Sequence, residues 1–163
     1  MNRRSLLKLG ASGTFLLVAG GLVASLTGRN ARQDRESVLR ALVPAMLGGA
    51  LPDAGPQRDA AIERAVESVA IAIGGLAPTA QAEIGQLFAL LAAPPTRLAL
   101  AGLAQGWEQA SGQDVSAMLQ RWRIHRLPLL KSGYQALHDL IAGSWYGHES
   151  TWQAIGYGGP VRL

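Results

Sequence analysis

The chain has 163 residues, no cysteine and a formal net charge of +4. This length indicates one domain, and the lack of cysteine excludes disulfides, cysteine-bound metal or iron–sulfur centres and covalently attached haem. Arg3, Arg4 and Lys8 supply three of the four net positive charges, so the remainder of the chain is nearly neutral. A nucleic-acid-binding domain would keep its basic excess in the folded part, and we therefore expect no nucleic acid partner.

Residues 1–28 have the layout of a twin-arginine export signal. Arg3 and Arg4 are followed by Leu6, Leu7 and Lys8, and then by an uncharged run that ends at Gly28. A receptor reads such a signal, so we expect the twin-arginine translocase as a partner during export and a periplasmic location afterwards. The alternative is a plain N-terminal membrane helix, because the uncharged run is about 20 residues long. Cleavage near Ser25 would release the chain, whereas an uncleaved segment would tether it to the inner membrane.

Residues 29–146 predict a helical domain. Asp34 is the expected N-cap of the first helix, and Pro44 is expected to kink or split that helix near Val43. No alternating strand pattern persists, so the predicted fold class is all-α, with five or six short helices around one core. A hydrophobic signal helix precedes this domain, and an irregular tail rich in glycine and aromatic residues follows it at 147–163. Apolar residues at helical spacing, separated by Gly and Pro, predict helices at about 34–47, 57–73, 79–91, 96–109, 115–122 and 129–145.

Three carboxylates lie at helical i, i+4 spacing on the second predicted helix, at Asp59, Glu63 and Glu67. Such a row resembles a metal or acid–base set. With no histidine at a matching spacing and with Arg64 alongside, it indicates a solvated helix face instead. We predict no metal-binding and no cofactor-binding residue in this chain.

The histidines do not suggest a catalytic centre. His138 and Asp139 are adjacent, so on a helix their side chains diverge by about 100° and are not expected to form a tight pair. No nucleophile or general base stands out, and we predict no catalytic residue. An enzyme with an unrecognised site that uses His138 or His148 is the remaining alternative.

The C-terminal end concentrates aromatic side chains. Four of the nine aromatic residues of the chain, Trp145, Tyr146, Trp152 and Tyr157, lie there and are followed by Pro160. Aromatic side chains are enriched at protein interfaces, so these five residues are the predicted partner-binding residues. The alternative is that Trp145 and Trp152 fold back over the helical core as a lid.

Basic residues gather near the fifth predicted helix, at Arg121, Arg123, Arg126 and Lys131 beside Trp122. They are interpreted either as the solvated side of an amphipathic helix or as a contact for acidic headgroups or an acidic partner.

The two ends of the chain resemble the small subunits of periplasmic flavin-dependent dehydrogenase complexes, the group typified by gluconate 2-dehydrogenase subunit 3. The resemblance rests on Arg3-Arg4 and on Trp145-Tyr146, Trp152, Gly156-Tyr157 and Gly159-Pro160. It implies a non-catalytic subunit that supports folding and export of a large flavoprotein of the glucose–methanol–choline type. It further implies that FAD lies in that partner, and it admits a cytochrome c subunit as electron acceptor. The alternative function is a stand-alone helical binding protein of the periplasm or membrane surface that holds an apolar ligand.

Overall fold

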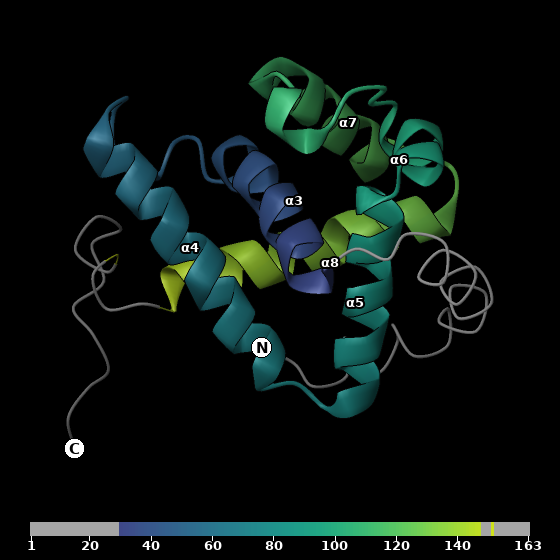
Figure 1. Cartoon of the computed structure of the whole chain (residues 1–163), viewed down its shortest axis with the longest axis horizontal. Coiled ribbons are helices and arrows are strands. Elements are labelled where there is room, and N and C mark those ends of the chain that lie inside the picture. The colour runs from purple at the N-terminus through teal and green to yellow at the C-terminus, as the bar shows by residue number, and fades with distance from the viewer. Residues whose placement is uncertain (1–29, 148–150, 152–163) are drawn as a thin grey trace.

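A computed structural model describes residues 30–147 and 151 of the chain (Figure 1). Within these residues the fold is all-helical, without strands, as the sequence predicts. Six α-helices and one short 3-10 helix surround a single core, which confirms the predicted fold class. The elements are α3 (Ala31–Met46), α4 (Pro56–Gly74), α5 (Pro78–Ala92), α6 (Pro94–Ala101), η1 (Trp107–Gln109), α7 (Gly112–Ile124) and α8 (Pro128–Tyr146).

Helix α3 is the central element, and α4, α5, α7, α8 and η1 pack around it (Figure 1). Its residues Val38, Leu39, Leu42 and Val43 are completely buried, as their i, i+3, i+4 spacing predicts. The central position of α3 explains why all four side chains are shielded from solvent.

The start of α3 differs from the prediction. Asn30, and not Asp34, is the N-cap, and its side chain accepts a hydrogen bond from the backbone amide of Arg32. Asp34 lies in the first turn, where its charge still complements the helix dipole. The helix also continues through Pro44 to Met46 without a split, because a proline in the last turn removes only one backbone hydrogen bond.

Prolines mark where four of the helices begin. Pro56, Pro78, Pro94 and Pro128 each occupy the first position of a helix, where the missing N–H costs no intrahelical hydrogen bond. Helices α4, α5 and α8 therefore lie within one residue of their predicted boundaries at each end.

The predicted helix at 96–109 is wrong. Helix α6 ends at Ala101, and Gly102 follows in the left-handed conformation with φ 73°, which only glycine adopts readily. Beyond it, the Trp107 indole nitrogen donates to the Leu91 carbonyl at 2.8 Å. Arg97 is also buried and donates to the carbonyls of Ala92, Leu103 and Ala104. These tertiary contacts hold residues 102–106 as a loop.

Helix α7 has the apolar face that its spacing predicts, with Val115, Met118, Leu119 and Trp122 buried. The ring of Trp122 lies directly against Gly133 of α8, where an added Cβ would be only 3.0 Å from the ring. Glycine therefore permits the close approach of α7 and α8 at this point.

The signal-like segment at 1–28 lies outside the described residues, and so does the tail at 147–163 apart from Gly147 and Thr151. Among the helices described, none is long and apolar enough by itself to cross a membrane. Helices α5 and α6 would pass that test only as a pair, and they are bent by 92°.

Candidate partner-binding site

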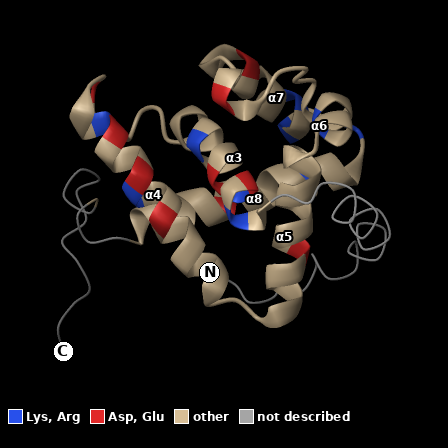
Figure 2. Cartoon of the chain, viewed as in Figure 1, with Lys and Arg blue, Asp and Glu red and all other residues tan. Residues whose placement is uncertain are grey.

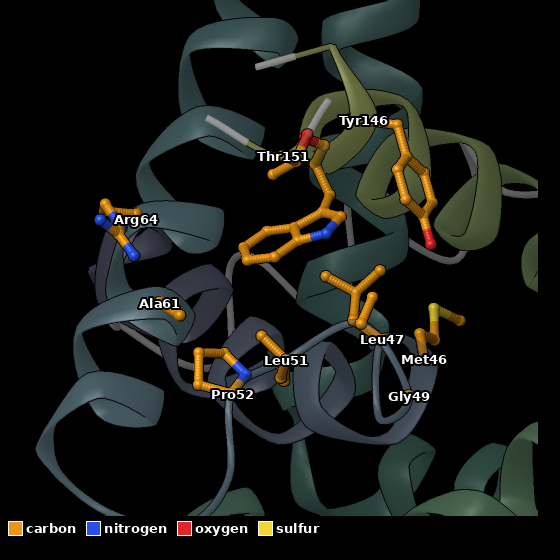
Figure 3. Close-up of a pocket in the computed structure, with 11 residues that line it drawn as sticks. Met46, Leu47, Gly49, Leu51, Pro52, Ala61, Arg64, Tyr146 and Thr151 are labelled. Atoms are coloured by element: carbon orange, nitrogen blue, oxygen red, sulfur yellow. The ribbon is translucent and has the colours of Figure 1, made fainter. Parts of the chain in front are cut away.

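A pocket of about 720 Å³ lies where the α3–α4 connection meets α4 and the C-terminal end of α8 (Figure 3). Its lining combines aliphatic and aromatic side chains with a single cationic residue. The lining residues are Met46, Leu47, Gly49, Ala50, Leu51, Pro52, Ala61, Arg64, Trp145, Tyr146 and Thr151.

The floor of the pocket is formed by the turn that follows α3. The amides of Ala50 and Leu51 both donate to the carbonyl of Leu47, at 2.7 and 3.1 Å. This compact turn buries the side chains of Leu47 and Leu51. Arg58 of α4 donates to the carbonyl of Pro52 at 3.0 Å and ties the connection to the next helix. The apolar floor is therefore held by backbone and side-chain hydrogen bonds before any ligand or partner arrives.

The opposite wall comes from the end of α8. Trp145 is partly buried and packs against the core, whereas Tyr146 keeps 40% of its surface exposed. The amide of Gly147 donates to the carbonyl of Gly143 and closes the helix. Thr151 is buried, and its hydroxyl donates to the carbonyl of Trp145 at 2.9 Å. Thr151 thus lies at the pocket.

Arg64 supplies the charge of the pocket (Figure 3). Its side chain is exposed, and within the described part of the chain it forms no ion pair. The sequence placed Arg64 beside the carboxylate of Glu63, but Glu63 pairs with Arg40 of α3 instead, at 2.7 and 3.0 Å. These hydrogen bonds from Arg40 hold the pKa of the Glu63 carboxyl below its ordinary value. The guanidinium of Arg64 is therefore available to an anionic group at the pocket.

Two of the five predicted partner-binding residues, Trp145 and Tyr146, line this pocket together. The other three, Trp152, Tyr157 and Pro160, lie outside the described residues, as do the export-signal residues Arg3, Arg4, Leu6, Leu7 and Lys8. Sequence reasoning missed the pocket residues that come from α3, from the connection after it and from α4, namely Met46, Leu47, Leu51, Pro52 and Arg64.

A signal for these missed residues exists in the sequence. Leu51 and Pro52 are apolar residues within a connection that otherwise consists of Leu47, glycine, alanine and Asp53. An apolar residue inside a surface connection is expected to contact something, because loops normally run over the protein surface. The sequence pattern does not predict that the end of α8 lies next to that connection.

A second, more polar pocket of about 610 Å³ lies beside the N-terminal half of α3 and η1. It contains Glu36, Arg40, Arg97 and Glu108. Each of the three guanidinium nitrogens of Arg97 donates to a backbone carbonyl, and Arg40 is paired with Glu63. Its cations therefore have structural roles, and we do not assign a ligand to it.

His138 and Asp139 are neighbours on α8, where the sequence predicts no tight pair. His138 Nδ1 lies 3.4 Å from Asp139 Oδ1. The approach is long and exposed, and Asp139 accepts a shorter hydrogen bond of 2.7 Å from Gln135. The ring of His138 stacks on Tyr134 at a centroid distance of 5.9 Å. His148 lies outside the described residues, and among those described no group of His, Asp and Glu could hold a metal ion.

Comparison of the chain with protein families, with curated proteins and with solved structures finds no match.

Proposed function

We propose that this chain is a non-catalytic small subunit that supports the folding and twin-arginine export of an FAD-dependent dehydrogenase and stays in its complex. The observation that carries the proposal is the exposed Tyr146 beside Trp145, at the edge of an open pocket where the aromatic tail begins. The same two residues begin the C-terminal pattern that resembles the small subunits of flavoprotein complexes. The proposed site would receive an apolar segment of the large subunit.

The composition of the pocket supports a protein ligand. Interface cores are rich in Tyr, Trp, Met and Arg, and all four residue types line this pocket. The Leu47–Leu51 turn and the Trp145 side chain are packed against the core, so little conformational order has to be created when the partner binds. Arg64 would pair with a carboxylate of the partner segment, which adds specificity to the apolar contact.

Export of the partner tests the proposal. The chain is co-expressed with the proposed flavoprotein partner, and the periplasmic amount of that flavoprotein is measured by FAD fluorescence. Changing Arg3 and Arg4 to Lys should retain both proteins in the cytoplasm, since the partner is proposed to carry no export signal of its own. Equal periplasmic amounts of flavoprotein with and without these changes would contradict the carrier role.

A second variant separates docking from export. Tyr146→Ala keeps the signal, so this chain should reach the periplasm while its flavoprotein stays behind. The matched control is Ile71→Ala on α4, where the side chain is 70% exposed and lies away from the pocket lining. Loss of flavoprotein export with both variants would indicate a general defect in folding.

The volume of the pocket favours a second candidate, the stand-alone binding protein for an apolar ligand. About 720 Å³ is within the range of small-molecule sites, and Arg64 would pair with the carboxylate of a fatty-acid-like ligand. Native mass spectrometry of the purified chain distinguishes the two candidates. A co-purified lipid that is lost in Arg64→Gln, together with no flavoprotein in pull-downs, would favour this second function.

A further inference from the structure

The connection between α7 and α8 exposes a group of large aliphatic side chains. Ile124 is 75% exposed, Leu127 57% and Leu129 39%. They lie within six consecutive residues, from the last residue of α7 to the second residue of α8. Single exposed apolar residues are ordinary, but three neighbouring ones that the core does not use indicate a contact surface.

The same connection is strongly basic. Arg123, Arg126 and Lys131 are exposed beside the three aliphatic residues, and we call these six residues the corner patch. The sequence contains no Asp or Glu between Val115 and His138, so nothing along this stretch neutralises the cations. Figure 2 shows basic residues where α6 and α7 lie side by side, whereas acidic and basic residues are mixed on α3 and α4.

The corner patch is held in place by the core beneath it. The amide of Leu127 donates to Nδ1 of His125 at 3.0 Å, and the amide of His125 donates to the carbonyl of Trp122. Trp122 is buried on one side of the patch, and Leu130 packs against the core on the other. With these two inward-facing anchors, the intervening aliphatic side chains cannot turn into the core without breaking its packing.

We propose that the corner patch is an interfacial contact for a bilayer that contains anionic phospholipid. Aliphatic side chains would enter the boundary between headgroups and acyl chains, and the three cations would lie at the phosphate level. Insertion of a few apolar residues gives only marginal binding by itself, so the contact depends on the negative surface charge.

The residue types favour a lipid surface over an acidic protein. Protein interfaces concentrate aromatic residues and contain few lysines at their centre, but the corner patch has three aliphatic residues, two arginines, one lysine and no aromatic residue. Long basic side chains around aliphatic residues match the chemistry of a headgroup layer.

The proposed bilayer contact leaves the candidate partner-binding site free. Leu129 and Trp145 lie near opposite ends of α8, about 24 Å apart at 1.5 Å per residue. The chain could therefore hold a partner at one end of α8 and rest on a bilayer at the other. This inference does not depend on the proposed function.

The lack of cysteine in the chain allows a position-specific test. Full-length Ile124→Cys is labelled with an environment-sensitive dye and mixed with vesicles of phosphatidylcholine, with or without phosphatidylglycerol. We expect a blue shift and brighter emission only with phosphatidylglycerol, reversed by high salt. The matched control is Ile71→Cys, because Ile71 is 70% exposed and lies on α4. Its dye should not respond, even if residues 1–28 bring the whole chain to the vesicle.

Removing single charges from the corner patch measures how much each cation contributes to the bilayer contact. With each of the variants Arg123→Gln, Arg126→Gln and Lys131→Gln, the dye response should require an about fivefold higher concentration of phosphatidylglycerol vesicles. No response at position 124, or an equal response at position 71, would overturn the proposal. A response at position 124 to the purified flavoprotein partner but not to phosphatidylglycerol vesicles would also overturn it and would assign the corner patch to a protein interface.

Discussion

The tryptophans of the two ends of the molecule are used differently. In the region of α6, η1 and α7, Trp107 and Trp122 are buried, and their indole nitrogens donate to the carbonyls of Leu91 and Leu100, each at 2.8 Å. At the end of α8, Trp145 is only partly buried, and the neighbouring Tyr146 is exposed at a pocket. One region uses aromatic side chains to complete the core, and the other presents them at the surface. The aromatic content of a segment therefore does not reveal its role until burial is known.

The largest effect is expected for Trp122→Ala. Trp122 is 2% exposed, fills the space over Gly133 and satisfies the carbonyl of Leu100. Its loss should lower the free energy of unfolding by about 3–5 kcal/mol through the cavity and the unpaired carbonyl. Urea unfolding followed by far-UV circular dichroism measures this, with Tyr146→Ala as the surface control. If Trp122→Ala lowered the free energy of unfolding by less than about 1 kcal/mol, Trp122 would not be a core residue in energetic terms, and the contrast with Trp145 and Tyr146 would be lost.

The next largest effect concerns binding. Tyr146→Ala should weaken assembly with the proposed flavoprotein partner by about 2 kcal/mol or more, with a much smaller change in stability. Trp152→Ala and Tyr157→Ala are expected to weaken assembly to a similar extent. Titration of the purified partner by isothermal calorimetry measures each variant. If all three bind as tightly as the unmodified chain, the end of α8 and the tail are not the interface.

A smaller loss of stability is expected for a substitution in the turn that separates α6 from η1. Gly102→Ala should cost about 1–2 kcal/mol of unfolding free energy, because φ at this position is 73°. The new Cβ would also lie 2.9 Å from Nη2 of Arg121, which donates to the Ala101 carbonyl. Gly85→Ala is the matched control, since Gly85 lies inside α5 with open space around it. That control should stabilise the chain by about 0.5–1 kcal/mol, and a loss at both positions would contradict the explanation by backbone strain.

The smallest effect is expected for the Arg40–Glu63 pair, which joins α3 to α4. The hydrogen bonds from Arg40 lower the pKa of Glu63 from its ordinary value of 4.5. The stabilisation is therefore present above pH 4.5 and is lost as the pH falls through the lower pKa of the folded state. Both side chains are about half exposed, so the effect is expected to be only about 0.5 kcal/mol.

Unfolding free energies measured between pH 3 and pH 6 test this last expectation, with Arg40→Gln as the comparison. The variant should lose part of the acid dependence, although the Arg32–Glu36 pair of α3 still contributes. An identical pH profile for the variant would show that the contact between α3 and α4 is held by packing alone.

Much of the fold follows from local patterns in the sequence. The periodic apolar residues of α3 and α7, and the prolines that begin α4, α5 and α8, place these helices within a few residues of their observed bounds. The predicted helix at 96–109 failed in part because it ran past Gly102, the local signal at which α6 ends. It also failed because the Trp107 indole bonds the Leu91 carbonyl of α5, 16 residues away, which only packing brings within reach.

The candidate site was predicted only in part for the same reason. Trp145 and Tyr146 were identified from composition, but the turn at Leu47–Leu51 and the position of Arg64 at the pocket were not. The helical pattern predicts which face of α4 is exposed to solvent, but it does not predict which cation pairs with a given carboxylate. That choice depended on α3 lying next to α4, so that Glu63 reaches Arg40.

The sequence by itself determined the all-α class, most helix boundaries and the set of residues available to the core, because periodicity and turn residues act within a few positions of the chain. The tertiary structure decided which tryptophans are buried, where the fourth predicted helix breaks and which side chains enclose the pocket at the end of α8. These outcomes depend on contacts between residues far apart in the chain, such as Met46 with the end of α8 across the pocket. Only the packing of complete helices brings such residues together.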